Sequence, residues 1–235
     1  MNTTKDFHLK QFSITGGHSG MAVSTDGILL GAWAKLTDDG SILDIGTGTG
    51  LLALMCAQRT ETSHITAIDL DSEAITAARK NVEQSPWANR IEVHQADIQT
   101  YSSPHTFEHI VCNPPYFNSG ETSNRQARAM ARHTHSLSHQ ALLSTCQRLL
   151  NSCGCASFIL PNAEGKAFIE MAQQQGWYVE RLCFVNTTER KPAYRLLFTL
   201  VKNPCTTAQS HLTIHQNAGY SAEFIRLTRD FYLKM

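Results

Sequence analysis

The sequence predicts an α/β fold, a single domain in which a seven-stranded, mostly parallel sheet carries helices on both faces. Short apolar runs alternate with longer amphipathic segments, as expected of parallel strands joined by crossover helices. A glycine-rich turn directly follows the first apolar run and opens a helix. The last two apolar runs are only about ten residues apart, too few for a crossover helix, so the last strand is expected to be antiparallel.

Apolar runs define the strands, and helical spacing with capping residues defines the helices. Strands are expected, in order, at 41–45, 65–69, 91–94, 109–112, 156–160, 178–185 and 196–201. Helices are expected at 51–59, 72–84, from the N-cap Ser138 to near Gly154, and 163–175. We expect residues 1–40 to form an N-terminal segment, 41–202 the core of the domain, and 203–235 an extension of a short strand and a helix that packs back on the core.

Length and composition exclude several classes of protein. The 235 residues are 42% hydrophobic, enough for a sizeable core. No apolar run approaches the roughly 18 residues that span a bilayer, and the start, MNTTKDFHLK, has no apolar signal core. We therefore expect a cytoplasmic protein with no membrane partner, and no obligate protein partner is evident. The 7 cysteines lie mostly in apolar runs, which favours reduced thiols.

Two groups of residues could suggest a metal, and neither predicts one. Cys153 and Cys155 form one close pair with no second pair to complete a tetrahedral site. His133, His135 and His139 do not share one helical face and have no carboxylate or cysteine partner. No metal is therefore expected.

The formal net charge of zero is a cancellation between the two halves of the chain. Residues 1–120 carry more acidic than basic side chains, and residues 121–235 carry more basic than acidic ones. This asymmetry indicates an acidic region that suits a cation and a basic region that suits a polyanion.

A GxGxG loop, Gly46 to Gly50, lies between the first strand and its helix. Glycines there permit a tight turn and a close approach of ligand to backbone. The spacing differs from the GxGxxG of dinucleotide folds, and no GK[ST] of a phosphate loop follows. The loop alone could also be a structural turn.

Three aspartates strengthen the interpretation of the loop as a binding site. Asp44, Asp69 and Asp97 are expected at the carboxyl edge of the sheet, where α/β folds bind ligands. Asp69 ends the second strand, where a carboxylate can accept both ribose hydroxyls. Asp71 is the rival for that role, but it suits the N-cap of the next helix better.

This succession of DIGTGTG, AIDLD and QADI resembles the S-adenosylmethionine site of class I methyltransferases, which have a Rossmann-like fold. The resemblance implies that Gly46 and Gly48 lie under the methionine part, Asp69 on the ribose and Asp97 near the adenine amino group. It also implies that Ile98 packs on the adenine ring and that Asp44 orients the loop or the methionyl ammonium. The candidate cofactor residues are Asp44, Gly46, Thr47, Gly48, Gly50, Asp69, Leu70, Asp97, Ile98 and Asn113.

Asn113, Pro114, Pro115 and Tyr116 directly follow the fourth strand and are the candidate catalytic residues. The prolines leave carbonyl acceptors beside the Asn113 amide and an aromatic ring, a combination that fits a planar group bearing NH₂. The Asn113 oxygen and the Pro114 carbonyl can each accept one N–H while Tyr116 stacks, and their dipoles favour positive charge on an attacking nitrogen. NPPY resembles a motif shared by methyltransferases of adenine N6 and of release-factor glutamine, with an NPPF variant for guanine N2.

The segment 20–33, NPPYF, QSPW and the terminal FIRLTRDFYLKM together resemble the bacterial tRNA N6-adenine methyltransferases that modify adenine 37 of a valine tRNA. This resemblance covers nearly the whole chain and implies tRNA as partner and substrate. It also implies that Thr25 and Asp26 contact the methionine end of the cofactor, although they could equally form a turn and an N-cap. The histidine-rich stretch near Arg132 departs from the resemblance.

Basic residues gather in the half of the chain that contains NPPY. They form three clusters, at Arg125, Arg128 and Arg132, at Arg190, Lys191 and Arg195, and at Arg226 and Arg229. Each cluster alone could be a solvated face, but together they favour phosphate contacts.

Three other functions stay open. The NPPY motif also fits N-methylation of another base in RNA or DNA. Glutamine methylation of a release factor would need an N-terminal domain to hold the protein, and about forty residues precede the first strand. An RNA-binding module that retains the methyltransferase fold would not need Asn113 and Tyr116.

Overall fold

Nine strands form one mixed sheet in the parts of the chain that the computed structural model describes, residues 6–16, 22–114 and 137–234. Their order across the sheet is β11-β10-β8-β9-β7-β6-β3-β4-β5. The strands are β3 Ser41–Ile45, β4 His64–Asp69, β5 Ile91–Gln95, β6 Phe107–Cys112, β7 Leu150–Pro161, β8 Tyr178–Thr188, β9 Ala193–Val201, β10 Ala208–Gln216 and β11 Gly219–Tyr220. A separate hairpin joins β1 Phe7–His8 to β2 Ser13–Ile14.

The predicted count of seven strands is wrong, although each predicted strand is present. The extra strands belong to the C-terminal extension, where β10 pairs in parallel with β8 and β11 pairs antiparallel with β10. Strand β9 is antiparallel to both neighbours, which confirms the prediction from the short connection before it.

The expected boundary near Gly154 is also wrong. The helix ends at Leu149 and β7 begins at once, because Leu150 takes an extended conformation and pairs with Phe107. The polar residues after Leu150 concealed this start, since the strand is only partly buried there.

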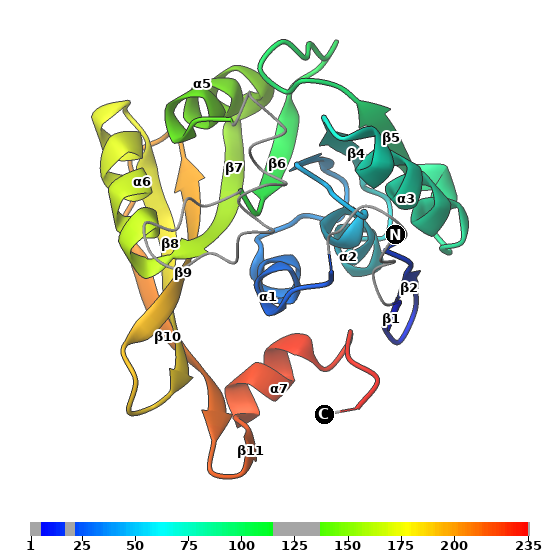
Figure 1. Ribbon diagram of the computed structural model, residues 1–235. Helices are drawn as coiled ribbons and strands as arrows, with labels where there is room; N and C mark the ends of the chain where they lie inside the picture. The colour runs from blue at the N-terminus through cyan, green and yellow to red at the C-terminus, as the bar shows by residue number, and fades with distance from the viewer. Residues whose placement is uncertain (1–5, 17–21, 115–136, 235) are drawn as a thin grey trace, which may run out of the picture.

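Helices cover both faces of the sheet, as predicted (Figure 1). They are α1 Thr25–Trp33, α2 Leu51–Arg59, α3 Ser72–Glu83, α5 His139–Leu149, α6 Asn162–Gln174 and α7 Ala222–Thr228, with a 3-10 turn at Ala88–Arg90. One apolar cluster lies between the sheet and α1, α2 and α7. A second cluster lies between the opposite face and α5 and α6. The amphipathic faces predicted from the sequence therefore pack onto the sheet.

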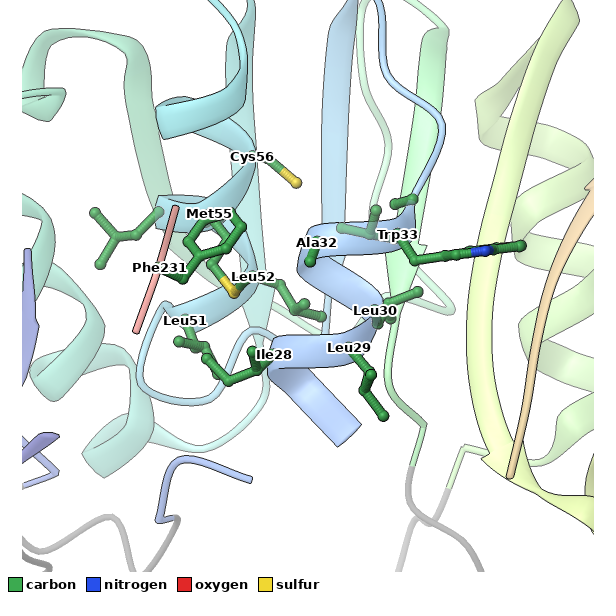
Figure 2. Close-up of a cluster of buried hydrophobic side chains, with 14 of the residues drawn as sticks. Ile28, Leu29, Leu30, Ala32, Trp33, Leu51, Leu52, Met55, Cys56 and Phe231 are labelled. Atoms are coloured by element: carbon green, nitrogen blue, oxygen red, sulfur yellow. The ribbon is translucent and has the colours of Figure 1, made fainter. Parts of the chain in front are cut away.

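Helix α1 is buried along almost its whole length, because it lies between the sheet, α2 and the C-terminal extension. In Figure 2, Ile28 lies beside Leu51 and Leu52 of α2, whereas Leu29 points to the other side of α1. The extension is also joined to the N-terminal hairpin, since Leu9 bridges Tyr232 and the Lys10 amide donates to the Phe231 carbonyl. The predicted return of the tail to the core is thus confirmed.

None of the helices in the described ranges combines the length and the apolar character that crossing a bilayer requires.

Gly154 lies where β7 approaches β6 closely. A methyl group at this position would meet the Glu108 carbonyl oxygen at 2.7 Å, a backbone atom that cannot rotate away. We expect Gly154→Ala to lower the free energy of unfolding by about 1–3 kcal/mol in urea titrations, as overpacking does. Gly219→Ala is the matched control, since nothing lies within 4 Å of the added methyl. Equal effects of both substitutions would contradict this account.

Candidate active site

The GxGxG loop lies at the carboxyl edge of the sheet, between β3 and α2. Gly46, Gly48 and Gly50 have φ of 71°, 57° and 87°, a left-handed region that side chains rarely adopt. The amides of Gly46 and Thr47 both donate to the Ile68 carbonyl, at 2.9 and 3.0 Å. This fixes the loop against the end of β4. Among the described residues, none places an atom within 4 Å of a methyl group built on Gly46, so open space adjoins the backbone there.

Asp44 is fully buried under this loop. One carboxylate oxygen, Oδ2, accepts from the Thr47 hydroxyl at 2.6 Å and from the Ala53 amide at 3.1 Å. The other, Oδ1, is buried and accepts no hydrogen bond from the described chain. Burial raises the pKa of Asp44 from 3.8 to about 7, against the lowering by the Thr47 and Ala53 hydrogen bonds. A cation reaching Oδ1 would stabilise the ionised form.

Asp69 holds the loop from β4, and Asp71 caps the next helix. Asp69 Oδ2 accepts from the Gly48 amide at 2.8 Å, and its Oδ1 accepts from the Asp71 amide at 3.0 Å. Asp71 is the N-cap of α3 and accepts from the Glu73 amide at 2.8 Å. The predicted assignment of Asp71 to the N-cap is confirmed, which leaves Asp69 as the carboxylate beside the loop. Leu70, between them, is exposed.

Asp97 and Ile98 follow β5, which pairs in parallel with β4. Both residues therefore lie at the carboxyl edge of the sheet, as Asp69 does. Asp97 Oδ1 accepts from the Gln99 amide at 2.9 Å, and this turn orients the carboxylate. Ile98 is buried and packs in the second apolar cluster.

Asn113 and Pro114 follow β6, the strand next to β3, so they lie at the edge that carries the glycine loop. Asn113 Oδ1 is buried and accepts no hydrogen bond from the described residues. A buried oxygen of this kind favours a ligand that donates an N–H, because leaving it unpaired costs free energy. Pro115 and Tyr116 lie outside the described residues.

Asn81 is a positioning residue that the sequence interpretation missed. Its Nδ2 donates to the carbonyls of Thr49 and Thr15, at 2.9 and 3.2 Å, and its Oδ1 accepts from the Thr15 amide at 2.9 Å. It joins the glycine loop to the N-terminal segment. Asn81 lies four and three residues after Ala77 and Ala78, on the buried face of the predicted helix. A polar residue on a buried face needs hydrogen-bond partners, and this could have identified Asn81 from the sequence.

Thr25 and Asp26 begin α1, and their N-cap is Ser24, whose hydroxyl accepts from the Gly27 amide at 3.1 Å. Asp26 Oδ2 accepts from Arg195 Nε at 2.7 Å in a mostly buried ion pair. The ion pair joins Asp26, which is predicted to contact the cofactor, to Arg195, which is predicted to contact RNA. Arg195 also stacks on the Tyr194 ring, 4.8 Å from its centroid.

The other basic residues occupy different surfaces. Arg190 and Lys191 are exposed in the turn between β8 and β9, whereas Arg226 and Arg229 lie on or just after α7. The cluster of Arg125, Arg128 and Arg132 lies outside the described residues, as do His133 and His135. The ring of His139 packs on Phe168 at 5.0 Å. The described residues bring no three metal-ligating side chains together.

Comparison with known proteins agrees with this geometry. Residues 24–145 match the methyltransferase small domain family. A tRNA1(Val) (adenine(37)-N6)-methyltransferase of Vibrio campbellii is 56% identical over 232 residues, which cover 99% of this chain and 97% of that protein. The corresponding protein of Aliivibrio salmonicida is 49% identical over 231 residues, 98% and 99% of the two chains.

Solved structures show the same fold at low identity. A predicted O-methyltransferase from Agrobacterium tumefaciens has a TM-score of 0.69 at 21% identity, over 88% of this chain and 96% of that one. A glycopeptide N-methyltransferase in complex with S-adenosyl-L-methionine has a TM-score of 0.56 at 12% identity, over 78% and 98%.

The fold and the glycine loop define a Rossmann-like methyltransferase that uses S-adenosylmethionine, which confirms the predicted class and cofactor. The chain belongs to the methyltransferase small domain family and, within it, to the family of the tRNA1(Val) (adenine(37)-N6)-methyltransferases.

Proposed function

We propose that this protein transfers a methyl group from S-adenosylmethionine to N6 of an adenine in tRNA, adenine 37 of a valine tRNA. The observation that carries the proposal is the buried Asn113 Oδ1, at the edge that carries the glycine loop, which accepts no hydrogen bond from the described part of the chain. The family relationship supports the choice of tRNA.

The residues beside the loop suit a cationic cofactor. The open space at Gly46 admits a ligand close to the backbone. Asp44 Oδ1 is buried and accepts nothing from the residues that the structure describes, which favours a cation nearby. Asp69 and Asp97 would hold the ribose and the adenine amino group, with Leu70 and Ile98 beside them. Thr25 and Asp26 would close the methionine end. When bound, S-adenosylmethionine supplies a sulfonium methyl whose C–S bond breaks as the C–N bond to the substrate forms.

Asn113 and Pro114 would orient the substrate amino group. The Asn113 side-chain oxygen and the Pro114 carbonyl each accept one N–H, which aims the nitrogen lone pair at the methyl group. Their dipoles stabilise the positive charge that develops on N6, so the surplus proton can leave to water after transfer. Tyr116 would stack on the base, and Pro115 would stiffen this turn. An adenine in an anticodon loop must leave its stack to enter the site.

Methyl transfer to total tRNA is the direct test. The protein is incubated with radiolabelled S-adenosylmethionine and unmodified total tRNA, and the RNA is then digested to nucleosides. Label in N6-methyladenosine supports the proposal. Label in a release-factor glutamine, in another base, or nowhere identifies a different substrate or a binding module, and each of these results overturns it.

Binding of tRNA should depend strongly on salt, whereas cofactor binding should not. Arg190, Lys191, Arg226 and Arg229 are the candidate phosphate contacts among the described residues, with Arg195 held in its ion pair. If about four phosphates are contacted, affinity for tRNA falls about a hundredfold between roughly 50 and 200 mM salt. Fluorescence anisotropy and calorimetry measure the two affinities. If tRNA binding and cofactor binding depended equally on salt, the cofactor would not be bound by an acidic region and the RNA by a basic one, contrary to the prediction.

A further inference from the structure

Two stacked aromatic pairs lie on the three strands at one side of the sheet, β8, β10 and β11, outside the site described above. His215, at the end of β10, stacks on Tyr220 of β11, with centroids 5.1 Å apart and planes at 23°. His211 stacks on Phe184 of β8 at 5.1 Å and 20°. His211 and His215 are exposed because they alternate with the buried Leu212 and Ile214.

Tyr220 is an unusually exposed aromatic residue for this chain, with 43% of its surface accessible. Its ring also contacts Phe224, which is buried at 1%, with centroids 4.9 Å apart. The ring is therefore supported by the core and stacked on His215 while much of it faces solvent. Held in this way, an aromatic ring loses little conformational freedom when another planar group stacks on it.

The β8–β9 turn beside this pair carries two exposed cations, Arg190 and Lys191, next to Glu189. The helix that follows Tyr220 carries one acidic and one basic residue, Glu223 and Arg226. Glu189 is hydrogen-bonded to Gln216 at 2.8 Å, which ties the turn that carries Arg190 and Lys191 to the end of β10. Two exposed cations are thereby held near the ring pair, an arrangement complementary to a polyanion with planar bases.

The pair lies at the same edge of the sheet as Asn113. Strand β10 is parallel to β8, and β8 has the direction of β7 and β6 because β9 is antiparallel to both its neighbours. The β8–β9 turn and the β10–β11 hairpin both project from this edge (Figure 1). Four strand spacings separate β10 from β6, roughly 19 Å. One RNA molecule can therefore reach both places.

We propose that His215 and Tyr220 form a stacking platform for an unpaired nucleotide of the substrate RNA, with Arg190 and Lys191 on its flanking phosphates. This inference rests on the proposed function for the identity of the RNA. A base stacked on Tyr220 would fix the RNA at a second point, so that the target adenine enters the site beside Asn113 in one orientation.

Substitutions of Tyr220 that separate stacking from packing test the platform. Tyr220→Phe keeps an aromatic face, whereas Tyr220→Leu keeps apolar contact with Phe224 and removes the ring. The matched control is Tyr178→Leu, because Tyr178 is 39% exposed and begins β8 at the opposite edge. The affinity of each variant for fluorescein-labelled unmodified tRNA is measured by anisotropy, and its KM and kcat for methyl transfer by radiolabel. Thermal unfolding and light scattering report stability and mass.

We expect Tyr220→Leu to weaken tRNA binding and raise KM about tenfold, with kcat and cofactor affinity unchanged. Tyr220→Phe and Tyr178→Leu should match the wild type.

Unchanged tRNA affinity in Tyr220→Leu, or an equal loss of affinity in Tyr178→Leu, overturns the platform. If Tyr220→Leu changes the molecular mass in solution but not the affinity for tRNA, the surface around Tyr220 is instead an interface with a second copy of the chain. If the wild type binds tRNA but transfers no methyl group to it, the proposed function fails while the binding comparison still decides the platform.

Discussion

Asn113→Ala is expected to lower kcat for methyl transfer about a hundred- to a thousandfold while leaving the affinity for S-adenosylmethionine nearly unchanged. Asn113 Oδ1 is buried and has no hydrogen-bond donor among residues 6–16, 22–114 and 137–234, so we expect its acceptor capacity to serve a group that arrives with the substrate. Removing it would leave the attacking nitrogen without one of its two acceptors in the transition state, where the positive charge is largest. Single-turnover kinetics measure the chemical step, and calorimetry measures cofactor affinity.

Asn203→Ala is the matched control for this change. Asn203 is exposed and its side chain donates to the Ser152 carbonyl at 2.9 Å, in the connection that follows β9. Its loss should leave kcat unaltered. If Asn113→Ala instead weakens cofactor binding as much as it slows transfer, Asn113 belongs to the cofactor site and the assignment to the methyl acceptor is wrong.

The glycine loop and its position could be predicted because they depend on neighbours in sequence. A GxGxG segment after an apolar run requires left-handed backbone, and the three positive φ values show it. The choice between Asp69 and Asp71 was also local, since an aspartate two residues beyond a strand end suits a helix N-cap. Local chemistry therefore indicated both the loop and the carboxylate that holds it.

Features that join distant segments could not be predicted in the same way. The ion pair of Asp26 and Arg195 joins residues 169 positions apart, and neither sequence neighbourhood indicates the other. Strand β10 is polar at most of its positions, because it lies near the edge of the sheet with one face exposed. Its periodicity was too weak to show that it joins the sheet, although pairing with β8 satisfies its backbone.

Asp44→Asn should stabilise the protein in the absence of cofactor and weaken its binding of S-adenosylmethionine. The folded state raises the pKa of Asp44 from 3.8 to about 7, chiefly by burial, so ionising this group opposes folding. The wild type therefore keeps its full stability below about pH 4 and loses part of it as the pH rises to about 7, whereas the amide does not titrate. At pH 8 the variant should exceed the wild type by roughly 4 kcal/mol at most, since one pKa unit corresponds to about 1.4 kcal/mol.

Urea titrations of both proteins between pH 4 and pH 8 measure this difference, and calorimetry at pH 8 measures the cofactor. Thr47→Val refines the test because it removes the hydroxyl that donates to Asp44 Oδ2 and leaves the carboxyl in place. The stability loss of that variant should begin near the same pH 4 as in the wild type but continue to higher pH, because the pKa of Asp44 rises further in the folded state only. Parallel pH profiles for Asp44→Asn and the wild type would mean that Asp44 does not change protonation in this range. An unchanged cofactor affinity would remove Asp44 from the residues that hold the methionyl ammonium. The urea titrations thus measure how much free energy of unfolding the buried carboxylate costs, and calorimetry measures how much it contributes to binding the cationic cofactor.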